Sequence, residues 1–364
     1  MTSSTASISL ETLDQLFSRM PTGSVDRAIL NSLRGLNHRQ VQSAVPSNKD
    51  TVGLTLFTRP QLNMQTDNIR NIRQMSQLLS NDGMSMQSYI RAVLDPRLSQ
   101  GFSMFGIEYP ALDCPLMDPY QAFIPCFTNN YLSQSGWPSI SVPTFTSKAG
   151  LYNETFSMVD GVVLNHGDWD LNVNFRNTRG DAVLYLLYTW VLYMSLVFEG
   201  RLVPYMDFMT ENELDYNTRV YRLVLDAKKQ KVVKIAATHA GFPIGVPVGD
   251  AFNDPGGIVY SEANKEIGVT FRCTGVDYFD AILVKEFNET VQCFNANMMD
   301  DYRDASMIAV PYSDIELFNF SGYPRIDPVT TELKWYVYLE HAQQVYTRRL
   351  RAMSQYNSNE EIGA

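Results

Sequence analysis

The side chains best suited to hold a metal or to move a proton near neutral pH are the four histidines, His38, His166, His239 and His341. One of them lies in the strongest local cluster, residues 166–170 (HGDWD), where an imidazole and two carboxylates could bind a hard cation. Glycine, aspartate and asparagine also tolerate the backbone of a tight turn. The cluster is therefore predicted to be a hairpin turn between two strands rather than a metal site.

Other segments that could carry chemistry lack part of the pattern that the chemistry needs. Residues 238–241 (THAG) are not accompanied by a nucleophile in an elbow sequence. Residues 245–249 (GVPVG) lack the Gly-Lys-Ser/Thr ending of a phosphate-binding loop. Asp277, Asp280 and the acidic run 300–304 do not have the spacing of a calcium loop. We therefore predict no catalytic residue, no cofactor and no metal site, and a protein that is not an enzyme.

The cysteines and the first residues indicate where the chain is made. Cys114, Cys126, Cys273 and Cys293 are far apart and form no CxxC pair, so reduced, buried thiols are expected. The opening segment 1–13 has neither a basic nor an apolar region of the kind found in secretory signals. Synthesis and assembly in the cytoplasm are therefore predicted.

The net charge of -10 is unevenly distributed along the chain. Residues 1–100 hold 10 Lys and Arg against 7 Asp and Glu, so the acidic excess lies in the last two-thirds. An acidic surface repels phosphate, which argues against tight or sequence-specific nucleic-acid binding. The same charge is compatible with the wall of a conduit through which DNA slides without sticking.

The elements expected before residue 100 are mainly helices. Residues 9–40 predict two short amphipathic helices, and residues 52–57 (VGLTLF) predict a strand that stops before a proline. Two more helices are predicted over residues 67–79 and 85–94, because their apolar residues recur at helical spacing. The following segment, 101–152, is rich in proline and aromatic residues, so it is predicted to be an ordered, irregular connector that touches partners.

The rest of the chain is predicted to be dominated by antiparallel strands. The clearest signal is a hairpin of residues 220–225 and 232–237 around a charged turn. Further strands and a closing helix are predicted as follows: strands at 155–164, 169–175, 268–273, 281–284 and 333–339, and a helix at 343–353.

The segment 182–198 (AVLYLLYTWVLYMSLVF) is the one candidate membrane span in the sequence. Asp181 and Glu199 bracket it, and its hydroxyl groups are scattered along its length rather than gathered at the ends. A buried helix or strand pair is therefore favoured over a span. A peripheral membrane protein stays an alternative.

Together these elements predict an α+β fold with helices gathered early and antiparallel strands later, around one long apolar helix. An N-terminal helical and irregular extension precedes it. The expected division of the chain is a helical arm (1–50), a helical and proline- and aromatic-rich region (51–152), an antiparallel β domain (153–330), and a C-terminal strand and helix with a disordered tail (331–364).

Several phrases of the sequence resemble virion structural proteins of large, contractile-tailed bacteriophages. They are residues 56–63 (LFTRPQLN), the bend 200–204, and residues 216–226 (YNTRVYRLVLD) with 235–238 and 242–243 after them. The resemblance covers roughly residues 52–325. It implies a tail-tube-like antiparallel β-sandwich or barrel in a protein near the tube and baseplate.

The resemblance implies a ring-forming subunit that starts the tail tube or joins it to the baseplate, lining or capping the DNA conduit. Its partners would be copies of itself and other tail or baseplate proteins, with DNA passing without tight binding and no membrane contact. A head-to-tail connector, neck or capsid-associated protein is the structural alternative. A cell-wall hydrolase is the enzymatic alternative, and it would need two carboxylates across a cleft. Substitution of Asp168 and Asp170 by alanine in a turnover assay would test this alternative.

Contacts between copies are predicted to involve five residues: Tyr221, Leu223, Leu225, Phe242 and Trp137. Strand alternation predicts that the first three face one side of the hairpin, with Arg222 and Val224 on the other. Leu223→Asp is therefore expected to prevent incorporation into a ring.

Overall fold

The computed structural model describes residues 52–80, 82–104, 107–162, 167–253, 256–257, 259, 265–318 and 321–362, and the two helices expected within 9–40 lie outside these residues. The strands are β1 (Val52–Phe57), β2 (Phe102–Met104), β3 (Ile107–Tyr109), β4 (Tyr131–Ser135), β5 (Thr144–Thr146), β6 (Ser157–Val159), β7 (Asp168–Arg176), β8 (Val220–Leu225), β9 (Val232–Gly245), β10 (Glu266–Tyr278), β11 (Met307–Ala309), β12 (Tyr323–Ile326) and β13 (Leu333–Tyr338). The α-helices are α3 (Thr66–Ile69), α4 (Met86–Leu94), α5 (Pro96–Gln100), α6 (Pro125–Asn130), α7 (Ala182–Phe198), α8 (Met206–Glu211), α10 (Ile282–Phe294), α11 (Asp300–Ser306) and α12 (Leu339–Ile362).

A six-stranded antiparallel sheet in the order β1-β8-β9-β10-β7-β4 forms the body of the molecule. Its two edge strands, β1 and β4, approach each other through side chains, because the Thr55 side chain on β1 is hydrogen-bonded to the Gln134 side chain on β4 at 3.3 Å. The sheet is thus a nearly closed barrel within a mixed fold of helices and strands. Two of its strands, β1 and β4, precede residue 153, so the sheet contains strands from both the expected 51–152 region and the expected 153–330 domain. The division of the chain into these regions stays a prediction.

The two sides of the sheet pack against different elements. On the inner side, four phenylalanines from β1, α6, β7 and β10 contact one another with ring centroids 4.8 to 6.4 Å apart: Phe57, Phe127, Phe175 and Phe271. On the outer side, α10 and the three-stranded sheet β11-β13-β12 cover β1, β8 and β9. The main antiparallel strands therefore form one curved sheet. Part of this sheet has an apolar core on both of its sides.

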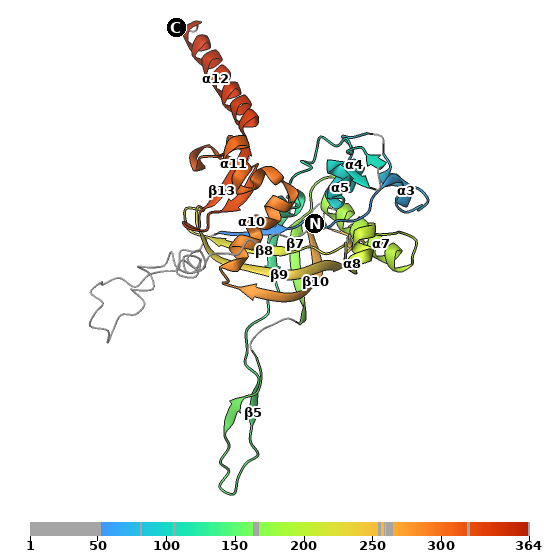
Figure 1. The fold of residues 1–364 in the computed structure, drawn as a ribbon, viewed down its shortest axis with the longest axis vertical. Helices are drawn as coiled ribbons and strands as arrows, with labels where there is room; N and C mark the ends of the chain where they lie inside the picture. Colours follow the sequence, from blue (N-terminus) through green and yellow to red (C-terminus); the bar gives the residue numbers. More distant parts are fainter. Residues whose placement is uncertain are drawn as a thin grey trace, which may run out of the picture.

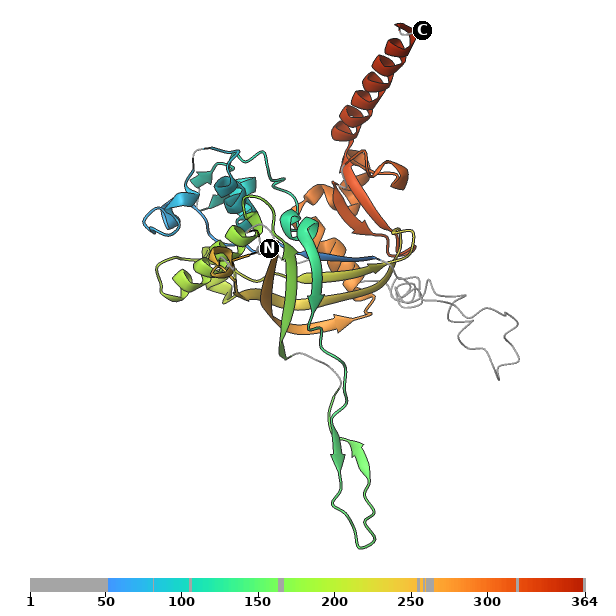
Figure 2. The same cartoon turned by 180° about the vertical axis from the view of Figure 1, so that it is seen from behind.

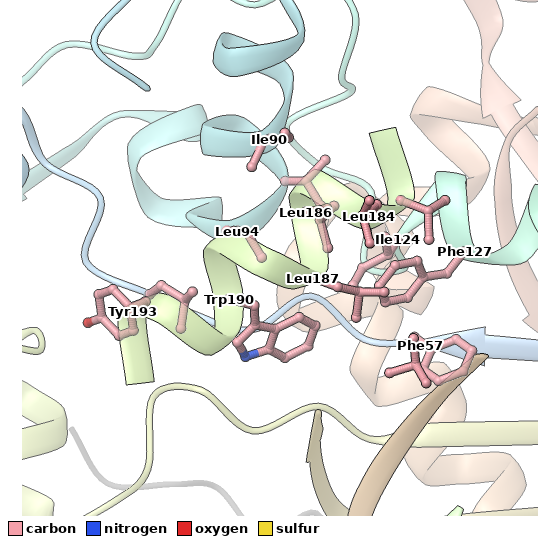
Figure 3. Packing of buried hydrophobic residues seen from close by; sticks show 14 of the residues in the cluster. Phe57, Ile90, Leu94, Ile124, Phe127, Leu184, Leu186, Leu187, Trp190 and Tyr193 are labelled. Carbon is pink, nitrogen blue, oxygen red and sulfur yellow. The ribbon is translucent and has the colours of Figure 1, made fainter. Parts of the chain in front are cut away.

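The apolar segment 182–198 is the helix α7, which packs beside the sheet against α4 and the connector (Figure 3). Trp190 and Tyr193 are fully buried on it. None of the helices among the described residues is long and apolar enough to cross a bilayer. With 17 residues α7 has an ordinary length, and the longest described helix, α12, is polar, so a fold built around one long apolar helix is not supported.

Three expected elements differ from the structure. Residues 281–284 were expected to form a strand, but they open the 13-residue helix α10, because a short apolar run does not by itself distinguish strand from helix. The helix expected over 67–79 is broken into α3 and a short 3-10 turn at Ser76–Leu78. The strand expected over 155–164 is reduced to β6, whose residues are all exposed.

The hairpin of β8 and β9 confirms the clearest sequence signal. The predicted alternation is also confirmed, because Tyr221, Leu223 and Leu225 are buried while Arg222 and Val224 are half-buried. The predicted strand at 333–339 is β13, and the predicted closing helix lies within α12.

Two slender elements project from the body in opposite directions (Figures 1 and 2). One is the connection between β4 and β7, which leaves the sheet as an extended hairpin containing β5 and β6. The other is α12, whose far end is the C-terminal end of the described chain. The molecule is therefore a barrel-like body with a hairpin at one end and a helix at the other.

Candidate assembly interface

The connection between β4 and β7 is here called the projecting hairpin, residues 139–162. Backbone pairing of β5 with β6 and a turn in which Gly150 and Glu154 are hydrogen-bonded give it a defined shape. Every residue from 139 to 162 except Ser147 is exposed. The exposed apolar side chains are Ile140, Val142, Phe145, Leu151, Tyr152, Phe156, Met158, Val159 and Val162.

Such exposure is unusual for apolar side chains in an isolated soluble subunit. Leu151 is 91% exposed and Tyr152 is 87% exposed at the tip. A two-stranded hairpin alone in water is marginally stable, and contiguous apolar surface commonly marks a protein contact. The projecting hairpin therefore has the properties of a segment that is completed by another molecule.

The strands that carry this hairpin present a polar outer face. Along β7 burial alternates strictly, so that every second side chain points away from the core. Three carboxylates and two guanidinium groups lie on the outward positions of β7 and β10: Asp168, Asp170, Glu266, Arg176 and Arg272. This face is therefore polar and carries nearly balanced charges.

Most charges on this face are paired within the subunit. Arg272 donates to Asp170 at 2.9 Å and lies 3.9 Å from Asp168, and the hydrogen bond to Asp170 raises the pKa of Arg272. Two hydroxyl groups of β10 donate to side chains of the neighbouring strand β7: Thr274 donates to Asp168, and Thr270 donates to Asn172. The two carboxylates proposed for a hydrolase test are thus neighbours on one strand that share a cation.

The remaining sequence-predicted chemistry is dispersed. Among the described residues, no group of three or more His, Cys, Asp and Glu side chains could hold a metal ion. His239 contacts Asp277 at 2.7 Å on the surface, and His341 is exposed near the ring of Phe318. His38 and His166 lie outside the described residues.

The acidic residues and cysteines have structural surroundings. Asp300 opens α11 and pairs with Arg303 and Arg325 of the same chain at 2.6 and 2.7 Å. The four cysteines are free: Cys114 and Cys273 are buried, Cys126 is half-buried and Cys293 is exposed. Burial raises the pKa of the Cys273 thiol to about 12, so it stays protonated near neutral pH.

The residues predicted for contacts between copies have different places in the subunit. Tyr221, Leu223 and Leu225 lie in the core between the sheet and α10, where Tyr221 and Phe287 have ring centroids 5.2 Å apart. Their side chains are thus occupied within their own subunit. Phe242 is half-buried against Tyr216, with ring centroids 5.5 Å apart. Their role between copies stays a prediction.

Trp137 is the one predicted contact residue that adjoins the projecting hairpin. It is half-buried at the root of the hairpin, with its ring centroid 5.3 Å from that of Trp169 and 6.1 Å from that of Tyr278. The Tyr278 hydroxyl donates to the carbonyl oxygen of Pro138 at 2.6 Å. These contacts fix the direction in which the hairpin leaves the body.

The phrase 56–63 proves to be a structural junction. The Arg59 guanidinium is buried and donates to four carbonyl oxygens and one hydroxyl, at 2.6 to 3.0 Å: Ala92, Val93, Pro119, Gln121 and Ser99. Burial lowers the pKa of Arg59 to about 10. All five guanidinium donors are used, so Arg59 joins β1 to α4, α5 and the connector.

A buried carboxylate completes this junction. Asp95 accepts from the backbone amides of Met64 and Leu98, each at 2.9 Å, and from the Tyr205 hydroxyl at 2.8 Å. Burial raises the pKa of Asp95 to about 6, against the effect of these hydrogen bonds. Sequence reasoning identified the phrase but not its partners, because hydrogen bonds to carbonyl oxygens leave no side-chain signature in the partner segments.

The described residues thus combine a barrel-like antiparallel sheet with a projecting apolar hairpin. The family model described as "Putative phage tail tube protein" matches residues 6–351, and the chain belongs to this family. The resemblance drawn from the sequence is thereby confirmed, and the chain is a component of the virion. The family is named for a structural tail part and indicates no catalytic activity.

Three solved structures are similar to part of this chain. The anti-feeding prophage cap (AFP tube terminating cap) is 12% identical with a TM-score of 0.27, covering 48% of this chain and 95% of that chain. The sheath/tube terminator of an extracellular contractile injection system (PVC) in the extended state is 12% identical with a TM-score of 0.24, covering 43% and 86%. The PVC sheath-tube complex in the extended state is 13% identical with a TM-score of 0.25, covering 43% and 82%. No curated protein matches the chain.

Proposed function

We propose that this tail tube family member is a ring-forming subunit that assembles side by side with copies of itself at one end of the tail tube. There it starts the tube or joins it to the baseplate, and lines or caps the DNA conduit. Other tail proteins are its neighbours, and DNA passes it without tight binding. Assembly takes place in the host cytoplasm.

The observation that carries this proposal is the projecting hairpin. Its exposed apolar side chains belong to none of the core clusters among the described residues, whereas large apolar residues of the barrel are buried. Obligate interfaces bury apolar surface of this kind, and an identical copy is present at the same concentration wherever the chain is made. Assembly of copies would therefore stabilise the hairpin.

The outer face of β7 and β10 supports the conduit part of the proposal. Its carboxylates slightly outnumber its guanidinium groups, and Arg272 is already engaged by Asp168 and Asp170. A wall of this kind offers DNA few free cations, so few counterions would be released on contact. In Figure 2 the strands β7 and β4 run along the near side of the body down to the hairpin.

No catalytic role is proposed. The two carboxylates of the hydrolase alternative lie side by side on β7 and share Arg272, whereas glycoside hydrolysis needs carboxylates on opposite sides of the scissile bond. An assay of peptidoglycan turnover by the purified protein, with Asp168→Ala and Asp170→Ala as comparisons, is expected to show no activity. Turnover that either substitution removes would overturn this part of the proposal.

The assembly test uses a variant in which three apolar residues of the projecting hairpin become polar: Phe145→Ser, Phe156→Ser and Met158→Ser. A matched control replaces exposed residues of similar type elsewhere on the body: Phe252→Ser, Tyr302→Ser and Met299→Ser. We expect rings in electron micrographs of the wild type and the control, and folded monomers for the hairpin variant. Rings of unchanged abundance in the hairpin variant would contradict the proposal.

A further inference from the structure

A pocket of about 270 Å³ lies between β1, the connector residues 116–129 and the three-stranded sheet β11-β13-β12. Its apolar walls come from all three parts: Leu56, Leu116, Phe123, Pro125, Pro324 and Trp335. Small-molecule sites usually have volumes of about 300–1,000 Å³, so this pocket lies below that range. Its size and lining suit an anchoring side chain of another protein, the kind of residue that dominates the energy of an interface.

The polar residues of the pocket provide an unpaired acceptor and a negative charge. Gln121 donates to the carbonyl oxygen of Gly322 at 3.1 Å, but its buried Oε1 atom has no hydrogen-bond partner among the described residues. A buried acceptor without a donor costs free energy, so a donor that enters the pocket is favoured. Asp118, the one charged residue of the described lining, is exposed and accepts from the Tyr323 hydroxyl at 2.6 Å. The pocket therefore fits an apolar group with a hydrogen-bond donor and a cation nearby.

The tip of the projecting hairpin carries this combination. Leu151 and Tyr152 are the most exposed apolar residues of the hairpin. Tyr152 combines a large apolar ring with a hydroxyl donor. Lys148 is exposed near the tip and is the only lysine or arginine in residues 139–162.

Hydrogen bonds within the tip hold it in one shape. The Gly150 amide donates to the Glu154 carbonyl oxygen at 2.9 Å, and the Tyr152 amide donates to the Glu154 carboxylate at 2.7 Å. Asn153 adopts a positive φ of 59°, a conformation in which asparagine is enriched. A tip that is already ordered loses less conformational entropy on binding.

The tip and the pocket do not meet within one subunit. Both views of the molecule show the hairpin extending from the body away from β13 and α12 (Figures 1 and 2). The pocket includes Trp335 of β13, so it belongs to the part of the body that is far from the tip. A contact between the two must therefore be between molecules.

We propose that the tip of the projecting hairpin of one copy docks in this pocket of a second copy. The inference rests on the proposed self-assembly and names one of its contacts. Tyr152 enters the pocket, its hydroxyl donates to Oε1 of Gln121, and Lys148 faces Asp118. Charge complementarity favours an identical copy as the partner, because the cation of the tip and the carboxylate of the pocket belong to the same chain. The contact is head-to-tail, so it closes into a ring or continues as a stack.

The first test uses substitutions in the full-length protein, followed by sedimentation velocity over a range of concentrations. Tyr152→Phe removes only the hydroxyl and is expected to weaken self-association on the order of tenfold. In protein that already carries Gln121→Leu, the same change is expected to have no effect, because the acceptor is gone. Tyr302→Phe, at an exposed tyrosine elsewhere, is the control and is expected to associate like the wild type.

A cross-linking measurement locates the contact directly. Copies with Tyr152→Cys are mixed with copies with Leu116→Cys and oxidised, both with Cys293→Ser because Cys293 is exposed. A disulfide-linked pair is expected in the mixture and in neither protein alone. Tyr302→Cys in place of Tyr152→Cys is the matched control and is expected to form no linked pair. If Gln121→Leu does not fold, this measurement decides alone.

The outcomes separate this inference from the proposed function. If the wild type assembles but no linked pair forms, the contact is wrong while the ring proposal stands. The same holds if Tyr152→Phe associates like the wild type, or weakens association equally in both backgrounds. If the Tyr152 variants assemble normally but fail to enter virions, the tip binds another tail protein and the inference is also wrong. A wild type that stays monomeric at all concentrations would overturn both.

Discussion

The barrel and the projecting hairpin use similar residues in opposite ways. Both are antiparallel strands that contain phenylalanine and valine. In the barrel these side chains reach full burial, as with Phe57, Phe175 and Phe271, whereas residues 139–162 leave theirs in water. The difference teaches that apolar content does not decide burial in a single subunit. The barrel is stabilised by its own core, whereas the exposed side chains of the hairpin belong to none of the described core clusters.

The largest expected effect in the barrel is that of a buried charge. Leu223→Asp places a carboxylate in the buried apolar cluster between the sheet and α10, which also contains Tyr221 and Phe287. We expect a loss of more than about 4 kcal/mol in the free energy of unfolding. Urea denaturation of the monomer would measure it, with Lys228→Asp on the exposed turn as the control. A folded Leu223→Asp subunit that merely fails to assemble would show that this residue belongs with the hairpin rather than with the core.

A smaller effect is expected at the junction between the two regions. Gly136 has φ of 105°, and a Cβ there would overlap the carbonyl oxygen of Asp170. Gly136→Ala should therefore cost about 2 kcal/mol and disturb the pairing of β4 with β7. Gly249→Ala, where a Cβ would meet open space, is the control in the same unfolding measurement. Equal stability of the two variants would mean that the root of the hairpin is not fixed by the barrel.

A further prediction concerns the acid stability of the small sheet that covers β8 and β9. Burial alone would raise the pKa of Asp327, but hydrogen bonds from Lys334, Val329 and Thr330 lower it to about 2. A lowered pKa stabilises the fold above pH 3.8, and this contribution is lost as the pH falls through about 2.

Asp327→Asn tests that prediction. After allowance for solvent screening, the substitution should cost about 1 kcal/mol at pH 7 and nothing below pH 2. Thermal melts from pH 2 to pH 7 would show the two proteins converging in acid. A constant difference across this range would assign the loss to packing instead of charge.

The smallest expected effect on the isolated subunit is in the projecting hairpin. Phe156→Ser should change the free energy of unfolding by less than about 0.5 kcal/mol, because the side chain is exposed. Phe175→Ser in the barrel is the contrasting variant and should be strongly destabilising. A large loss in Phe156→Ser monomers would show that the hairpin packs on its own subunit and would remove the contrast.

The sequence predicted well those elements whose pattern is local. The β8–β9 hairpin combines alternating burial with a turn in which Lys229 adopts a positive φ of 58°, and both features are visible in consecutive residues. The family resemblance was likewise carried by short phrases and was confirmed over residues 6–351.

Features that depend on distant partners could not be predicted. The strand predicted at residues 281–284 was wrong, because four apolar residues suit a strand and a helix equally. Only their packing against the sheet favours the helix α10. The residues of the projecting hairpin were expected to form part of an irregular connector and a strand. Their exposure was not predicted, because it depends on which other elements cover them rather than on the residues themselves. The exposure of Met206 and Met209 on α8 likewise had no sequence signal.

The place of Arg59 has a consequence for the order in which a new chain becomes folded. Its acceptors extend to Gln121, and the neighbouring Thr58 pairs with Thr218, which is 160 positions further along. The strand β1, the first among the described residues, therefore cannot pair with β8 until more than half of the polypeptide has been translated. Such distant closure slows folding, so this strand is the stretch of nascent chain that a host chaperone would have the longest time to bind.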